Sequence, residues 1–248
     1  MKTAYFQKDA LGNLIDSFVY DSYMFYKSKG YTAITFEENN LPASYKGQPL
    51  YGYTDICEKM FNLYGTGLPS TFTYPKLDHV FYFRHMHTVN TVSSYNNAVN
   101  SLRGTINKPV FVKPDKVKLF TGQLIDSDFW QQHFIKYLQQ SKLHVSEVVE
   151  FISEWRVFVY NGSIVDCRHY TGDPLKFPQA AWLGLLLDNL LELNKMPIAF
   201  TMDVGRLKTG SWVLVECNDM WATGSYGCDR EKYVECYDSR WNEIMNIK

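Results

Sequence analysis

Two short stretches carry the pattern that decides the fold, Asp203-Val204-Gly205 and Glu216-Cys217-Asn218. Glu216 follows Asp203 by thirteen residues. β-Branched and apolar residues around both stretches predict two strands, Ala199–Val204 and Ser211–Cys217. The glycine-containing segment Lys208-Thr209-Gly210 between them predicts a turn. We therefore expect the two strands to pair.

Three polar side chains of these strands are predicted to share one sheet face. A strand alternates faces with period two, so Glu216 and Asn218 point the same way, and pairing can bring Asp203 beside them. Two carboxylates and an amide oxygen form an all-oxygen site that suits Mg²⁺, particularly Mg²⁺ shared with nucleotide phosphates. A sheet rim with solvated acidic side chains would show the same pattern, so residues further upstream must decide.

Length and charge restrict the kind of protein. The chain has 248 residues, enough for one large domain or two small ones, and 46% of them are hydrophobic, which is ample for a core. Its 25 basic and 26 acidic side chains leave a net charge of −1. This balance gives no general attraction to nucleic acid or anionic membranes, so we predict neither as a partner.

The cysteines and the apolar segments bear on localisation. Five cysteines occur without a CxxC motif or a zinc-like spacing, which favours free thiols in a reducing cytoplasm: Cys57, Cys167, Cys217, Cys228 and Cys236. The first nine residues lack the apolar core of a signal peptide. The apolar stretch Ala180–Leu187 is too short to span a bilayer. These features predict a soluble, cytoplasmic protein.

The first third of the chain alternates between strand and helix signals. We expect strands at Thr3–Gln7 and Tyr31–Phe36, and helices at Leu14–Lys29 and Tyr53–Tyr64. This rhythm predicts a small open α/β unit, closed by the loop Leu68–Pro75. We place an N-terminal domain at residues 1–75 and a larger domain at residues 76–248.

The remainder of the chain is predicted to be α+β. Asn161-Gly162 between two β-rich runs is a strong hairpin signal. The predicted strands are Val110–Lys113, Val145–Phe151, Arg156–Tyr160 and Ser163–Arg168, and the predicted helices are Asp126–Gln139, Pro178–Leu193 and Glu231–Met245.

Two lysines upstream of the acidic pair could bind phosphate. Lys113 leaves a buried strand and enters a loop, where its ammonium group is a suitable point charge for a phosphate. The loop Lys118-Leu119-Phe120-Thr121-Gly122 adds a second cation, a hydroxyl and backbone N–H groups. Taken alone, each lysine could equally be a solvated surface residue.

A further segment could hold a base and a ribose. At Glu147-Val148-Val149 a strand runs into a connection that can offer backbone N–H and C=O groups to an adenine edge. Glu154, seven residues after Glu147, could hold ribose hydroxyls, and Arg156 could bind a phosphate or acyl phosphate oxygen bidentately. An ordinary exposed Glu–Arg pair is the alternative for these two residues.

Through four features in fixed order, the chain resembles the ATP-grasp superfamily: the strand lysine Lys113, the loop Lys118–Gly122, the segment Glu147–Val149 with Glu154, and Asp203 with Glu216 and Asn218. The matching region covers roughly residues 107–227. The chain looks closest to a clade noted for one arginine and two lysines, to which Arg156, Lys113 and Lys118 correspond. The resemblance implies an ATP-grasp fold, in which a small N-terminal α/β unit precedes two α+β lobes with the nucleotide between them.

The resemblance also implies an enzyme, an ADP-forming ligase that joins a carboxylate to an amine or thiol through an acyl phosphate. Its implied partners are a small-molecule or peptide carboxylate and a nucleophile, foremost an amine. Its implied cofactors are ATP and one or two Mg²⁺ ions. The implied residues are Arg156 and Lys118 for catalysis; Lys113, Lys118, Thr121, Gly122, Glu147, Val148, Val149 and Glu154 for ATP; and Asp203, Glu216 and Asn218 for the metal.

One departure leaves the acceptor open. Many ligases of the superfamily follow the metal-binding Asn with a loop containing Pro and Gly, whereas this chain continues from Asp219 to Gly227 without proline. Whether Arg84, Arg168, Asp219 or Tyr226 line the substrate pocket is open from sequence. Two other functions also stay open, a small-molecule kinase of ATP-grasp type and a non-catalytic ATP-binding regulator.

A cluster of histidines is another candidate metal site. His79, His85 and His87 lie in an aromatic segment, and His85-x-His87 could bind a metal, but no third ligand follows this pair at a recognisable spacing. A structural role is therefore favoured for these side chains.

Overall fold

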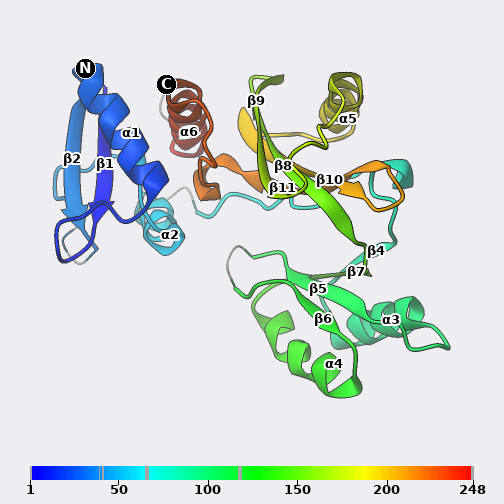
Figure 1. The fold of residues 1–248 in the computed structure, drawn as a ribbon. Coiled ribbons are helices and arrows are strands. Elements are labelled where there is room, and N and C mark those ends of the chain that lie inside the picture. Colours follow the sequence, from blue (N-terminus) through cyan, green and yellow to red (C-terminus); the bar gives the residue numbers. More distant parts are fainter. Residues whose placement is uncertain (1, 39, 41, 65–66, 117–118, 247–248) are drawn as a thin grey trace.

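The computed structural model describes residues 2–38, 40, 42–64, 67–116 and 119–246. These residues form three separate sheets with helices packed against them, as Figure 1 shows. The mixed α/β architecture that the sequence predicts is confirmed. In the described part of the chain, no helix has both the length and the apolar composition needed to cross a bilayer.

The N-terminal sheet is small and parallel. Its strand order is β2-β1-β3, and both neighbours run parallel to the central strand. Its elements lie within a few residues of the prediction where one was made: β1 (Thr3–Lys8), α1 (Ser17–Ser28), β2 (Thr32–Glu37), β3 (Leu50–Tyr51) and α2 (Thr54–Leu63). The two-residue β3 was not predicted, because so short a strand has no detectable period.

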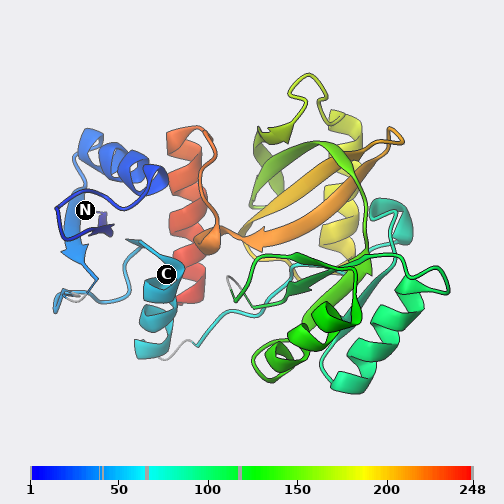
Figure 2. The same cartoon turned by 60° about the horizontal axis from the view of Figure 1, so that its bottom comes forward.

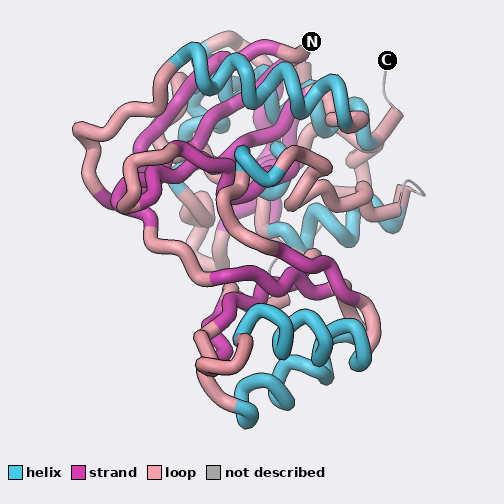
Figure 3. Tube along the Cα trace, turned by 90° about the vertical axis from the view of Figure 1, so that its right-hand side faces the viewer, coloured by secondary structure: helices cyan, strands magenta, loops and turns pink. Residues whose placement is uncertain are grey.

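The second sheet is antiparallel, with the order β4-β7-β5-β6. Its strands are β4 (Met86–Val89), β5 (Val110–Pro114), β6 (Gln123–Ile125) and β7 (Leu143–Glu147). Two helices lie together on one side of this sheet, α3 (Val92–Arg103) and α4 (Asp128–Ile135), the latter continuing as a 3₁₀ turn over Lys136–Gln139 (Figure 3). We call this unit the small lobe.

Several features of the small lobe differ from the prediction, which also lacks the short strands β4 and β6. Helix α3 was not predicted, although Thr91 and Ser94 form a capping box at its start and could have signalled it. The single strand predicted at Val145–Phe151 is wrong, because β7 ends at Glu147 and the next strand begins at Phe151. The residues between them connect two different sheets.

The third sheet is the largest, with the antiparallel order β11-β10-β8-β9 (Figure 2). It contains β8 (Phe151–Tyr160), β9 (Ser163–Gly172), β10 (Ala199–Leu207) and β11 (Trp212–Asp219). The predicted hairpin joins β8 to β9 through Asn161 and Gly162, whose φ angles of 47° and 71° are those of a tight two-residue turn. We call this sheet the large sheet.

The two faces of the large sheet have different chemistry. Helix α5 (Ala180–Leu193) packs on one face, where its leucines meet apolar side chains such as Val157, Met202 and Leu214. Because side chains alternate along a strand, neighbours such as Arg156 and Asp203 lie on the opposite face. The fold thus keeps a polar face free of α5.

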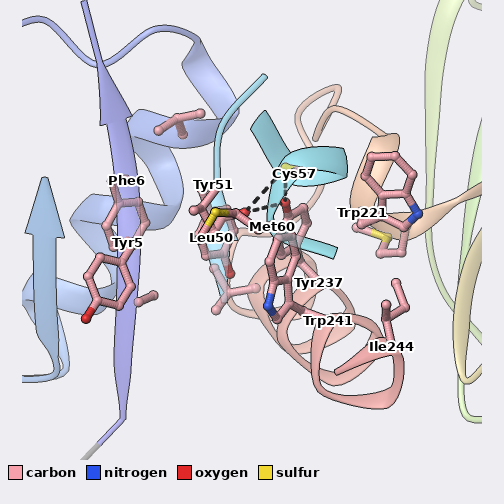
Figure 4. Packing of buried hydrophobic residues seen from close by; sticks show 14 of the residues in the cluster. Tyr5, Phe6, Leu50, Tyr51, Cys57, Met60, Trp221, Tyr237, Trp241 and Ile244 are labelled. Atoms are coloured by element: carbon pink, nitrogen blue, oxygen red, sulfur yellow. Dashed lines mark hydrogen bonds between the residues drawn. The ribbon is translucent and has the colours of Figure 1, made fainter. Parts of the chain in front are cut away.

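The C-terminal helix α6 (Arg230–Ile244) completes the core beside the N-terminal sheet. Figure 4 shows Tyr237 and Trp241 of α6 packed against Tyr51 and Cys57, with Trp221 on the side of the large sheet. Trp221 belongs to the short 3₁₀ helix at Met220–Ala222, and another 3₁₀ helix covers His79–Phe81. The division into domains at residues 1–75 and 76–248 stays a prediction. Helix α6 belongs to the second range but shares one hydrophobic core with the N-terminal sheet.

A buried carboxyl group of α6 makes the stability of this core dependent on pH. Asp238 accepts hydrogen bonds from the hydroxyls of Tyr26 (2.5 Å) and Tyr51 (2.7 Å), and burial raises its pKa to about 6. The folded state therefore binds this proton more tightly than the unfolded state, and the stabilisation is lost as pH rises through 6. Relative to Asp238→Asn, the wild-type free energy of unfolding should fall by about 2.5 kcal/mol between pH 4 and pH 8.

Urea unfolding of both proteins across this pH range measures the difference. Asp21→Asn is the matched control, because Asp21 is an α1 carboxylate on the surface that pairs with Arg230 at 2.7 Å. Parallel pH profiles for the wild type and Asp238→Asn would contradict the prediction.

Candidate nucleotide and metal site

A cavity of about 1020 Å³ lies between the small lobe and the large sheet. This volume is at the upper end of the range that small-molecule sites occupy. The small lobe contributes apolar and aromatic side chains, and the large sheet contributes acidic ones. The lining residues are Tyr74, Arg84, Phe111, Lys113, Phe120, Thr121, Gly122, Gln123, Leu124, Trp130, Ser146, Glu147, Val148, Val149, Phe151, Glu154, Val215 and Glu216.

A cluster of charged side chains adjoins this cavity at Glu216. Arg156 donates two hydrogen bonds to Asp203, from Nε to Oδ1 at 2.8 Å and from Nη2 to Oδ2 at 2.6 Å. Lys113 forms an ion pair with Glu216. Asn218 donates through Nδ2 to Asp203 Oδ2 at 3.2 Å and to Glu216 Oε1 at 3.3 Å, which joins the two ion pairs.

Strand register explains why these residues meet. On the central strand β10, Asp203 lies opposite Arg156 of β8 on one side and opposite Glu216 of β11 on the other. Asn218 follows Glu216 by two residues and so emerges on the same face. The structure therefore brings Asp203, Glu216 and Asn218 together, as the period-two argument requires.

Burial makes the electrostatic interactions in this cluster stronger than on the surface. Asp203 is 2% exposed and Arg156 is 9% exposed, so each ion depends on its partner. Burial lowers the pKa of the Lys113 ammonium to about 8, although the Asp203 carboxylate opposes this shift. Burial also raises the pKa of Glu154, whose Oε2 accepts a 2.8 Å hydrogen bond from the Tyr170 hydroxyl.

The donor set fits a hard divalent cation. Asp203 and Glu216 provide carboxylate oxygens, and Asn218 contacts both of them. Mg²⁺ is usually held by one or two carboxylates together with water and phosphate oxygens, so a full protein cage is not required. Within the described ranges, no group of three or more His, Cys, Asp or Glu side chains is arranged to hold a metal ion. His79, His85 and His87 therefore do not form such a group either.

The glycine-containing loop lies at the cavity wall. Thr121 and Gly122 both line the cavity, whereas Lys118 lies outside the described residues. Gly122 also has a packing role, because a Cβ atom on this residue would lie 2.1 Å from Cζ of Phe111. A side chain there would displace the ring that forms part of the cavity wall.

The connection between the small lobe and the large sheet also lines the cavity. Glu147, Val148 and Val149 contribute to the lining, and so does Glu154. Two hydrogen bonds hold Glu147 to the residue before β4, one from its N–H to the His85 carbonyl at 3.0 Å and one from the His85 N–H to Glu147 Oε2 at 2.8 Å. All of the predicted ATP-binding residues that the structure describes therefore line one cavity.

The residues left open by the sequence fall into different places. Arg84 lines the cavity and donates to the carbonyls of Leu214 (3.2 Å) and Val215 (2.7 Å). The ring of Tyr226 lies over the Arg156 guanidinium, with 4.4 Å from Cζ to the ring centroid.

Two further candidates are engaged elsewhere. Arg168 pairs with Asp166 at 2.8 Å on β9. Asp219, whose side chain is 10% exposed, is paired bidentately with Arg240 of α6, at 2.8 and 2.6 Å. Neither Arg168 nor Asp219 belongs to the lining of the cavity.

Several cavity residues had no signal in the sequence. Tyr74, Phe111, Phe120 and Trp130 line the cavity, but aromatic residues are equally common in cores. Tyr170 holds Glu154 and lies 5.6 Å from the Arg156 guanidinium, and only the register of β8 with β9 reveals this.

Comparison with known proteins agrees with this geometry. Two lobes around a cavity, with a lysine and an acidic pair at its end, are the arrangement expected of an ATP-grasp protein. Residues 89–236 match the family described as ATP-grasp domain, R2K clade family 2, so the chain belongs to this family of ATP-grasp enzymes. The resemblance inferred from the sequence is therefore confirmed. The comparison with curated protein sequences gives no match.

Solved structures support the same fold. The D-cycloserine synthetase DcsG superposes with a TM-score of 0.59 at 11% identity, over 96% of this chain and 99% of that chain. The macrocyclase MdnC from Microcystis aeruginosa MRC, bound with the precursor peptide MdnA, has a TM-score of 0.53 at 12% identity, over 94% and 98%. The ATP-grasp ligase PsnB, complexed with minimal precursor, Mg and ADP, has a TM-score of 0.52 at 9% identity, over 96% and 97%.

Proposed function

We propose that this protein is an ATP-dependent ligase that activates a carboxylate as an acyl phosphate and transfers it to an amine or a thiol. The observation that carries the proposal is the cluster of Lys113, Arg156, Asp203, Glu216 and Asn218 beside a cavity between two lobes. Membership of the ATP-grasp family supports the use of ATP. The named relatives act on small molecules or peptides, which supports either kind of carboxylate as substrate.

Each part of the cavity has a proposed task. Adenine lies against the connection Glu147–Val149 and the aromatic wall, and Glu154 accepts hydrogen bonds from the ribose. Lys113 and the loop with Thr121 and Gly122 bind the phosphates, together with Lys118 of the same loop. Asp203, Glu216 and Asn218 hold Mg²⁺, whose positive charge neutralises phosphate oxygens when it is bound.

The reaction consists of two displacements. One oxygen of the bound carboxylate attacks the γ-phosphorus, the bond to the β-phosphate oxygen breaks, and ADP leaves. The nucleophile then attacks the acyl carbon, loses a proton and expels inorganic phosphate. Charge neutralisation and positioning supply most of the catalysis in such transfers.

Arg156 is proposed to stabilise the acyl phosphate. Its two bonds to Asp203 use two of the five guanidinium N–H groups, so three remain for phosphate oxygens. Tyr170 and Tyr226 lie over its guanidinium at 5.6 and 4.4 Å and restrict its orientation. A preorganised donor of this kind is effective because it does not have to reorient during the reaction.

The experiment that tests the reaction class traps the intermediate. The purified protein is incubated with ATP, Mg²⁺, hydroxylamine and pools of carboxylic acids, amino acids and peptides. A ligase of the proposed type should release ADP and form a hydroxamate, because hydroxylamine intercepts the acyl phosphate. Release of AMP and pyrophosphate would instead indicate an adenylate, and a stable phosphorylated product would indicate a kinase. ATP binding without turnover in any pool would favour the non-catalytic regulator.

A further inference from the structure

A second cavity, of about 500 Å³, lies where three distant segments of the chain meet. Residues 70–76 precede the small lobe, residues 194–197 follow α5, and Arg240 and Glu243 belong to α6. Among the described residues, Tyr74 is the one that lines both this cavity and the nucleotide cavity, so the two cavities are neighbours. The second cavity therefore lies outside the proposed ATP site.

Hydrogen bonds between its walls hold the second cavity in shape. The Asn194 side chain accepts from the Lys76 backbone N–H and donates to the Lys76 carbonyl, both at 2.9 Å. The Cys217 N–H donates to the Thr73 carbonyl at 2.8 Å, which ties the same segment to β11. Glu243 accepts from the Ile198 N–H at 3.1 Å. The cavity is thus built by fixed contacts, as ligand sites usually are.

Its charged side chains favour an anion. Lys76, Lys195 and Arg240 line the cavity, and Glu243 is the one acidic residue among the lining residues that the structure describes. Within the described part of the chain, neither lysine has an acidic partner within 4.0 Å. The two lysine ammonium groups are therefore available to bind an anionic ligand. The positive charge of Arg240, in contrast, is already paired with Asp219 and Glu243.

Arg240 gives the cavity additional donors. Its exposed fraction is 8%, and its bonds to Asp219 and Glu243 come from Nε, Nη1 and Nη2. These bonds use three of its five N–H groups, so two remain. The hydroxyl of Ser70 also lies in the lining, while Phe72 and Met196 provide apolar surface. The lining is suited to an anion that carries a small apolar body.

We propose that this second cavity binds a small organic anion, a carboxylate or a phosphate ester, through Lys76, Lys195 and the remaining donors of Arg240. The site is separate from the proposed ATP site and does not depend on the proposed reaction. Its ligand approaches from solvent past the two exposed lysines and reaches the buried guanidinium.

Titration calorimetry on the full, nucleotide-free chain tests the proposal. The probes are inorganic phosphate and, separately, succinate, and preference for one distinguishes a phosphate ligand from a carboxylate ligand. We expect saturable binding of at least one probe. The double variant Lys76→Ala/Lys195→Ala should weaken this binding roughly tenfold, since each partly solvated charge contributes modestly. Lys59→Ala, which removes an exposed lysine of α2 outside both cavities, should leave it unchanged.

Lys113→Ala separates this site from the nucleotide cavity, where phosphate could also bind. Binding that persists in Lys113→Ala and is weakened in the double variant supports the second site. Binding that is lost in Lys113→Ala and retained in the double variant belongs to the nucleotide cavity and overturns the proposal. Absence of saturable binding of both probes also overturns it, and neither result affects the proposed ligase reaction.

Discussion

Replacement of Glu216 by alanine is expected to abolish Mg²⁺-dependent ATP turnover while the protein stays folded. Glu216 supplies one of the two carboxylates of the proposed metal site, and its other contacts are to Lys113 and Asn218. The variant removes a metal ligand and also leaves the Lys113 ammonium without its carboxylate partner. Loss of such preorganised groups costs a factor of about a hundred to a thousand each, so turnover should fall by about a thousandfold or more. ADP release at saturating ATP measures the effect.

Two further variants separate the role in metal binding from a general loss of charge. Glu216→Gln keeps the shape of the side chain and removes its charge, so its turnover should also fall to background. Glu150→Ala removes an exposed carboxylate that pairs with Lys208 at 3.3 Å, and its turnover should stay near that of the wild type. Circular dichroism and thermal unfolding verify that each variant is folded. Unchanged Mg²⁺-dependent turnover in a folded Glu216→Ala variant would refute the metal assignment.

Replacement of Arg156 is expected to lower turnover far more than it weakens ATP binding. The guanidinium is proposed to stabilise charge that develops as the acyl phosphate forms, so its contribution appears mainly in the transition state. Arg156→Ala should lower kcat by about a hundredfold to a thousandfold. The Kd for ATP should change much less, because Lys113 and the connection Glu147–Val149 remain.

The Arg156 experiment needs a variant that keeps the buried charge balance. Removing one member of a buried ion pair can cost about 3 to 5 kcal/mol of stability, and Arg156→Ala leaves Asp203 without its partner. Arg156→Lys retains a positive charge and loses the bidentate geometry, so it should fold and still show reduced kcat. Arg168→Lys is a matched control from the neighbouring strand, outside the cavity lining. Equal losses in kcat and in ATP affinity for Arg156→Lys would contradict a role specific to the transition state.

Local patterns were enough to predict most of the secondary structure. The alternation in β8 to β11, the Asn161-Gly162 turn and the capped helices have signals within a few residues. The predicted bounds agree at the hairpin turn, where β8 ends at Tyr160 and β9 begins at Ser163, but the observed β8 begins earlier, at Phe151, and β9 ends later, at Gly172. The failures have local causes as well. The short strands β3 and β6 span too few residues for a period to appear, and the break between β7 and β8 falls in an apolar run that looks like one strand.

The candidate site was predictable in part because its residues follow strand periodicity. Only the pairing of β10 with β11 is required to bring Asp203, Glu216 and Asn218 together. These strands are consecutive and a short turn joins them, which strongly favours their pairing. Their roles in metal binding remain a proposal, as do the roles of Lys113, Glu154 and Arg156. Lys118 belongs to the same loop in sequence but lies outside the described residues.

By itself the sequence determined the ATP-grasp family, the order of most of the strands and helices, and the shared face of Asp203 and Glu216, because these depend on motifs and on periods of a few residues. Only the tertiary structure decided that Asp219 is paired with Arg240 of α6, that Tyr170 and Tyr226 flank Arg156, and that Lys76, Lys195 and Arg240 surround a second cavity. These contacts join residues whose separation along the chain carries no pattern. Packing of distant segments and the register between strands create them, and both are settled only when the whole chain folds.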